Sequence, residues 1–236
     1  MFSTHRLLGV LLWLALPAVA EEQGLAQPAT EIPTTQTSTM FDPRSAEAGG
    51  VRRWRVEVDG DIALRAAPSR DAASIANLTE DALLSNLGCA PSGGALWCAV
   101  RDAFGGRRAY LPALALVPAR GPDGTVPTGR DDSKDRVTRH DVDAVGEVAC
   151  AQERGQPLGP CSARVARSGG GDATVAVRFA NGFSRLLFFT HGRFRAANPT
   201  MSGTGTDTDH HIDGDQHLIR VDDQMFEINA GLLFGP

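Results

Sequence analysis

The residues best suited to chemistry lie in one short segment near the C-terminus. Residues 206–217 hold four carboxylates and three imidazoles, from Asp207, Asp209, Asp213, Asp215, His210, His211 and His217. Carboxylate oxygens and neutral imidazoles are the usual ligands of divalent metals, so one hypothesis is a metal site or a metal-assisted enzyme. The spacing fits no known motif. A calcium loop begun at Asp209 puts Arg220 where a bidentate glutamate is required, and no H-E-x-x-H occurs.

The same segment has a simpler interpretation as a solvated loop that leads into a strand. Adjacent His210 and His211 would point to opposite faces of an extended chain, which hinders binding of one ion. Asp213-Gly214 is typical of a turn before a strand that starts near Gln216. Nucleophile elbows and phosphate-binding glycine loops are absent from the sequence, and the glycine-rich residues 168–172 predict a hairpin turn. We therefore expect no catalytic residue, no metal ligand and no cofactor.

The four cysteines fall into two local pairs, Cys89 with Cys98 and Cys150 with Cys161. Four cysteines allow three connectivities, and the long separation between the pairs makes the two local bridges the economical choice. A four-cysteine zinc site would need C-x-x-C spacing, which the sequence lacks. Two disulfides indicate an oxidising compartment.

The first 20 residues have the order of a secretory signal peptide. Arg6 precedes an apolar run over residues 7–16, and residues 18–20 form a small-residue A-x-A exit. The alternative is an N-terminal membrane anchor, but a spanning helix needs about 20 apolar residues. We expect cleavage, a mature chain without a membrane span, and a periplasmic or secreted location.

Composition shifts divide the rest of the chain into four parts. Residues 21–50 are rich in Thr, Ser, Pro, Ala, Gln and Glu and predict a disordered tether. Turn residues and charges over 119–137 predict a solvated linker. The parts on either side, 51–118 and 138–236, carry short alternating apolar runs, so the expected fold class is all-β.

The two folded parts differ in their strand patterns. Five short strands are expected near 55–58, 62–65, 83–87, 97–100 and 109–111, which is typical of a small barrel. The C-terminal part predicts an antiparallel β-meander. Its signals are Asn181-Gly182 as a two-residue hairpin turn, and further turns at His191-Gly192 and Asp222-Asp223.

The first folded part resembles the bacterial SH3-like domain of exported proteins. The resemblance is carried by residues 62–69, by Trp97 and Val100 in the stretch 96–100, and by 109–116, which includes Tyr110-Leu111. It covers most of residues 55–117. It implies an SH3-like barrel that recognises cell-wall or envelope components and does not catalyse a reaction.

From this resemblance we expect a binding site on the barrel formed by Phe104, Arg107, Arg108 and Tyr110, with Trp97 in the core. The expected partner is a cell-wall peptide or an envelope protein. Nucleic acid is not expected, because 28 acidic residues exceed 23 basic ones and the formal net charge is −5. A further alternative is a secreted inhibitor or structural partner of an envelope protein.

Overall fold

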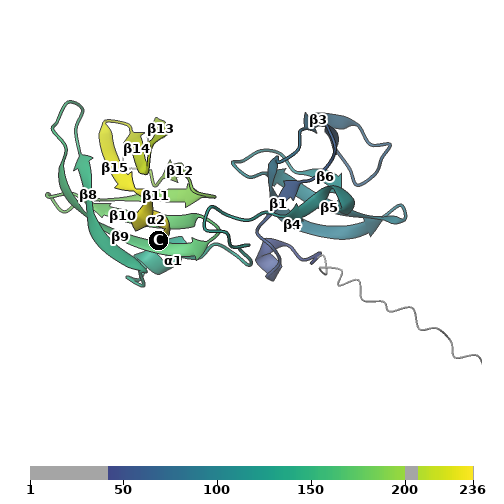
Figure 1. Cartoon of the computed structure of the whole chain (residues 1–236), viewed down its shortest axis with the longest axis horizontal. Helices are drawn as coiled ribbons and strands as arrows, with labels where there is room; N and C mark the ends of the chain where they lie inside the picture. Colours follow the sequence, from purple (N-terminus) through teal and green to yellow (C-terminus); the bar gives the residue numbers. More distant parts are fainter. Residues whose placement is uncertain (1–41, 200–206, 236) are drawn as a thin grey trace, which may run out of the picture. The chain divides into compact units, whose positions relative to one another are not determined.

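The computed structural model describes residues 42–199 and 207–235, and most of its elements are strands (Figure 1). The predicted signal peptide and tether residues 21–41 lie outside the described residues. No helix within the described ranges is long and apolar enough to cross a membrane. The prediction of an all-β fold with two antiparallel sheets is confirmed.

The first sheet has seven strands and is nearly closed into a barrel; we call it the barrel-like sheet. Its strands pair in the order β3-β2-β6-β5-β4-β1-β7. Their bounds are β1 Arg53–Val56, β2 Ile62–Arg65, β3 Ser74–Leu78, β4 Leu83–Ser92, β5 Ala95–Asp102, β6 Ala109–Pro112 and β7 Leu116–Pro118, with the short 3₁₀ helix η2 (Ala113–Ala115) before β7. Trp54, Leu84, Val100 and Leu111 are fully buried in its core.

Two of these strands, β3 and β7, were not predicted from the sequence. Strand β3 lies at one edge of the sheet and four of its five residues are exposed, so it has no alternating apolar pattern to detect. Strand β7 has only three residues and pairs with β1 at the other edge. The predicted core position of Trp97 is confirmed, since its side chain is buried.

The last residues of the predicted tether are ordered against this sheet. Ser45 caps a short 3₁₀ helix, η1 (Ala46–Ala48). The Asn86 side chain donates a 2.7 Å hydrogen bond to the Arg44 carbonyl, and the Cys89 backbone N–H donates to the Pro43 carbonyl at 2.8 Å. Residues 42–50 therefore belong to the folded part of the chain.

The second sheet has eight strands, and its order is β12-β11-β10-β9-β8-β15-β14-β13. The strands are β8 Ala144–Ala151, β9 Gly159–Gly169, β10 Asp172–Arg178, β11 Ser184–Thr190, β12 Arg193–Ala197, β13 Thr208–Asp213, β14 Gln216–Val221 and β15 Gln224–Asn229. Two meanders, β8 to β12 and β13 to β15, are joined where the last strand, β15, pairs with the first, β8. Helix α2 (Ala230–Phe234) follows β15 and places Leu233 in the core.

The turns of this sheet follow the sequence signals with one difference. His191 and Gly192, with φ of 49° and 76°, form the two-residue turn between β11 and β12 as predicted. The prediction of a two-residue turn at Asn181-Gly182 was wrong. Phe179 and Phe183 are hydrogen-bonded across a three-residue loop, and Gly182 takes the left-handed position, with φ 87°, that such a loop requires.

The segment 119–137, predicted as a solvated linker, contains ordered structure. Helix α1 (Ser133–Thr138) buries Ser133 and Val137, the latter against Ala166 and Ala176 of the eight-stranded sheet. Gly121 approaches so closely that a Cβ there would lie 2.2 Å from the Gly170 backbone. This close approach needs a glycine and fixes the segment against the turn between β9 and β10.

Both predicted disulfides are present. Cys89 and Cys98 are direct register partners on β4 and β5, whereas Cys150 and Cys161 lie diagonally on β8 and β9. Each bridge joins neighbouring strands of one sheet, so each sheet carries its own covalent link. Such bridges persist in oxidising compartments.

We predict that the double substitution C150S and C161S lowers the free energy of unfolding by about 2 to 3 kcal/mol, because a bridge over this loop length restricts the unfolded chain by that amount. Urea denaturation followed by circular dichroism measures the change. An unchanged denaturation midpoint would show that the bridge contributes nothing to stability.

Candidate functional site

A groove of about 500 Å³ lies on the barrel-like sheet between the end of β4 and the start of β6. Buried Trp97 contributes to its lining from β5, and half-buried Tyr110 lines it from β6. The Arg108 guanidinium lies 5.8 Å from the centre of the Tyr110 ring. A cation over a tyrosine ring stabilises both side chains by about 0.5 to 1 kcal/mol at an exposed site. The groove is thus an aromatic surface with a positive charge at one end.

The groove continues past Trp97. A neighbouring hollow of about 460 Å³ shares Pro68, Ser92 and Trp97 with it and extends to Arg70 and the Gly93-Gly94 turn. Together the two hollows have room for an extended chain, with apolar and polar groups alternating along the walls.

The four residues predicted as a binding site do not lie together in the structure. Arg108 and Tyr110 line the groove. Phe104 is 40% exposed but lies in a different hollow, next to Arg193 and His210 of the eight-stranded sheet. Arg107 is exposed and is not among the residues that line the groove. The reason is that residues 103–108 form a connection between β5 and β6 that turns Phe104 away from the start of β6.

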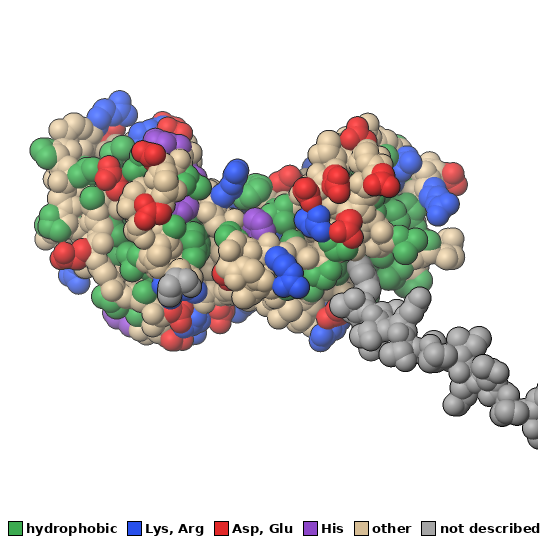
Figure 2. Space-filling model, in the orientation of Figure 1, with side chains coloured by type: hydrophobic (Ala, Val, Ile, Leu, Met, Phe, Trp, Pro, Cys, Tyr) green, Lys and Arg blue, Asp and Glu red, His purple; other side chains and the backbone are tan. Residues whose placement is uncertain are grey.

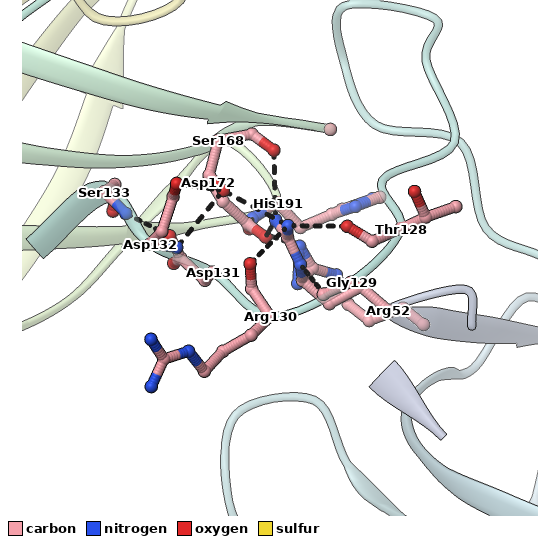
Figure 3. A network of polar contacts seen from close by, with 12 residues as sticks. Arg52, Thr128, Gly129, Arg130, Asp131, Asp132, Ser133, Ser168, Asp172 and His191 are labelled. Carbon is pink, nitrogen blue, oxygen red and sulfur yellow. Dashed lines mark hydrogen bonds and ion pairs between the residues drawn. The ribbon is translucent and has the colours of Figure 1, made fainter. Parts of the chain in front are cut away.

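A buried polar network lies where β1 begins. Asp172 is almost fully buried; it pairs with Arg52, as Figure 3 shows, and also with Arg53. The carboxylate also accepts a 3.0 Å hydrogen bond from the His191 backbone N–H. Arg53 is the first residue of β1 and Arg52 directly precedes it, whereas Asp172 is the first residue of β10 in the other sheet. The Asp172 carboxylate of one sheet therefore pairs with two guanidinium groups from the start of the other sheet.

The two arginines of this network differ in their hydrogen bonding. Arg52 donates to the carbonyls of Thr128, Gly129 and Arg130 at 3.1 to 3.3 Å and to Ser168, besides Asp172. Arg53 has one side-chain hydrogen bond, to Asp172, and its buried Nε has no partner. Burial lowers the pKa of the Arg53 guanidinium, the charge of Asp172 opposes this, and the charge of Arg52 adds to it.

Sequence reasoning did not identify this network. The adjacent arginines at 52 and 53 resemble the solvated end of a strand, and Asp172 resembles an ordinary turn residue after three glycines. A useful signal is the glycine run itself. Gly170 and Gly171 both have positive φ and are buried, which marks a turn packed against other backbone and not an exposed one.

The segment 207–217 is an edge strand and a turn, not an open loop. His210 on β13 stacks on His217 of β14, with ring centres 5.2 Å apart and Nε2 of His210 3.0 Å from Nδ1 of His217. His217 is buried against Phe189 and Phe234, and burial lowers its pKa to about 4. His211 is exposed, as expected for a neighbour on the opposite strand face.

Two carboxylates of this segment have partners other than the imidazoles. Asp207 pairs with Arg220 at 2.9 Å, and Asp215 accepts a hydrogen bond from Asn229. The Arg220 hydrogen bond lowers the pKa of Asp207. Within the part of the chain that the structure describes, no three His, Cys, Asp or Glu side chains gather so that they could hold a metal ion.

We predict that D172N lowers the free energy of unfolding by about 3 to 5 kcal/mol, because it leaves two buried guanidinium groups without a counter-charge. The matched control is D223N, which removes one partner of the exposed Asp223–Arg154 pair and should change stability by less than about 1 kcal/mol. Chemical denaturation of both variants measures the difference. Equal effects would mean that the burial of Asp172 does not matter.

We also predict that stability falls as the pH is lowered from 7 to 5. The folded-state pKa of His217 lies near 4 and the unfolded value near 6.5, so the unfolded chain takes up a proton that the folded chain excludes. At pH 5 the loss is about 2 kcal/mol from this residue. The variant H217Q should show a smaller decrease between pH 7 and pH 5 in urea denaturation. If H217Q and the wild type lose the same free energy of unfolding between pH 7 and pH 5, His217 is not the residue responsible.

The chain thus carries an aromatic groove, a buried arginine–aspartate network and a stacked histidine pair. Of these, the groove and the network border hollows that a ligand could occupy. No family model, no curated protein and no solved structure matches this chain. A function for the chain must be inferred from its own side chains.

Proposed function

We propose that this chain is an exported, non-enzymatic binding protein of the bacterial cell envelope. In this proposal the barrel-like sheet recognises an extended peptide, either in the cell wall or on an envelope protein, through the groove beside Tyr110. The observation that carries the proposal is the groove itself, with Trp97 and Tyr110 in its walls and Arg108 at one end. Such a combination suits a peptide, which presents apolar side chains, backbone carbonyls and negative ends.

The size of the groove supports a peptide as the ligand. The two adjoining hollows measure about 500 and 460 Å³ and share Trp97. They are open grooves on a sheet surface, and an extended chain fills such a shape better than a compact molecule does. Strands β4, β5 and β6 hold the walls, and the Cys89–Cys98 bridge fixes β4 to β5 beneath the groove. A wall held this firmly loses little entropy on binding.

The export part of the proposal has separate support. The two disulfides need an oxidising compartment to persist. Residues 1–20 have the composition of a signal peptide. The resemblance to bacterial SH3-like domains of exported proteins points in the same direction, because such domains commonly recognise envelope components.

A pull-down with purified peptidoglycan tests the cell-wall form of this proposal, and co-purification from envelope extracts tests the protein-partner form. We predict that Y110A reduces retention at least about tenfold, since an aromatic anchor at a binding surface typically contributes 2 kcal/mol or more. The control is F183A, which removes an exposed aromatic side chain from the loop between β10 and β11 of the other sheet. It should leave retention unchanged.

Two results would contradict the proposal. Absence of retention on peptidoglycan together with no co-purifying envelope protein would count against the binding function. Retention that is equal for the wild type and Y110A would place the contact elsewhere on the molecule. Circular dichroism of each variant shows whether the sheet remains folded.

A further inference from the structure

A second cavity, of about 440 Å³, lies over the Arg52–Arg53–Asp172 network. Its charged lining residues are five arginines and three carboxylates: Arg52, Arg53, Arg101, Arg108, Arg130, Glu47, Asp131 and Asp172. The lining therefore has a surplus of positive charge. We refer to it as the arginine cavity.

Arg53 is the clearest sign that this cavity has a ligand. Its side chain is 5% exposed, yet its guanidinium makes a single side-chain hydrogen bond, to a carboxylate that Arg52 also uses. A guanidinium has five N–H donors, and its Nε–H is buried here without a partner. Buried donors are almost always satisfied, because leaving one unpaired costs free energy. That Nε–H is too buried for a ligand oxygen to reach, so the donors of Arg53 that can meet an acceptor in the cavity are those on its terminal nitrogens.

Arg101 and Arg108 supply further unused charge. Among the described residues, neither forms an ion pair with a carboxylate, while Arg130 pairs with Asp135 at 3.4 Å. Arg101 is the last residue but one of β5 and Arg108 directly precedes β6, so both lie on the rim formed by the barrel-like sheet. The cavity thus combines one buried guanidinium that has a single acceptor with two exposed ones that form no ion pair among the described residues.

The positive cavity contrasts with the outer surface of the same sheet. Figure 2 shows acidic side chains gathered over the barrel-like part of the chain. Exposed Glu57 and Asp81 are among the carboxylates of this sheet, and Arg55 bridges them at 2.7 and 2.6 Å. An anion that approaches this surface is repelled by the carboxylates and attracted to the arginine cavity.

We propose that the arginine cavity is a binding site for an oxyanion, a carboxylate or phosphate group, held by Arg53 and Arg101 with Arg108 at the rim. The planar fork of a guanidinium matches both anions, since each offers two oxygens at the spacing of two N–H donors. Asp172 orients Arg53 from behind, and Arg52 is already fully used in fixing the adjacent segment. This inference does not depend on the groove, although Ser45, Leu87 and Arg108 line both hollows.

Isothermal titration calorimetry of the full chain at constant ionic strength in chloride tests the site. The probes are inorganic phosphate, N-acetyl-trialanine, and the C-terminal amide of that peptide. We expect saturable binding of phosphate or of the acid, and at least about tenfold weaker binding of that probe to R101Q, because the variant removes a charge-assisted hydrogen bond. The control R178Q removes an exposed arginine of β10 that does not line the cavity. It should bind as the wild type does.

Each outcome decides a separate point. The site is supported if R101Q weakens the binding of phosphate alone, or weakens the binding of the acid but not of the amide. The probe whose binding is weakened identifies the source of the anion. Equal binding of acid and amide places the peptide in the groove and counts against the cavity. No saturable binding of phosphate or acid, or equal weakening in R101Q and R178Q, overturns the proposal. R53K keeps the charge but removes the fork, and should also weaken binding; if it fails to fold, R101Q decides.

Discussion

The structure depends on one buried carboxylate that faces two guanidinium groups. Asp172 lies where water is excluded, so its charge would be very unfavourable without Arg52 and Arg53, and theirs would be unfavourable without it. The arrangement requires the β9–β10 turn to be tight enough to bring Asp172 to the start of β1. Gly170 and Gly171 make this possible, because a side chain on Gly171 would collide with the His191-Gly192 turn. One glycine turn thereby positions the charge that links the two sheets.

The same interaction explains why a positive hollow exists at this place. Two guanidinium groups share one carboxylate, so the network keeps a net positive charge, and only Arg52 has a full set of acceptors. The aromatic groove beside it depends on different forces, chiefly burial of Trp97 and the contact between Arg108 and Tyr110. The sheet that carries both is rigid, because β4 and β5 are joined by hydrogen bonds and by a disulfide. Binding by such surfaces needs little rearrangement of the backbone.

Local pattern was enough to predict much of the fold and little of the site. The strand predicted at 62–65 and the turn predicted at His191-Gly192 depend on neighbours in sequence, and the structure contains both. Strand β3 was not predicted, because an edge strand without a buried face has no alternation of apolar and polar residues. The Asp172 network was not predicted, because its members are about 120 positions apart and the glycine run before Asp172 does not show which residues it meets. Phe104 and Tyr110 are close in sequence, yet the β5–β6 connection separates them.

The pairing of β8 with β15 has a consequence for how the chain acquires its fold. Cys150 on β8 is the register partner of Phe226 on β15, so the central contact of the eight-stranded sheet joins residues from the two ends of that region. Contacts between such distant positions form slowly, since the intervening chain must be brought together first. During synthesis one edge of β8 stays unpaired until β15 has been added. The eight-stranded sheet therefore closes in a fixed order, with the β8–β15 contact available only after every strand between them has been made.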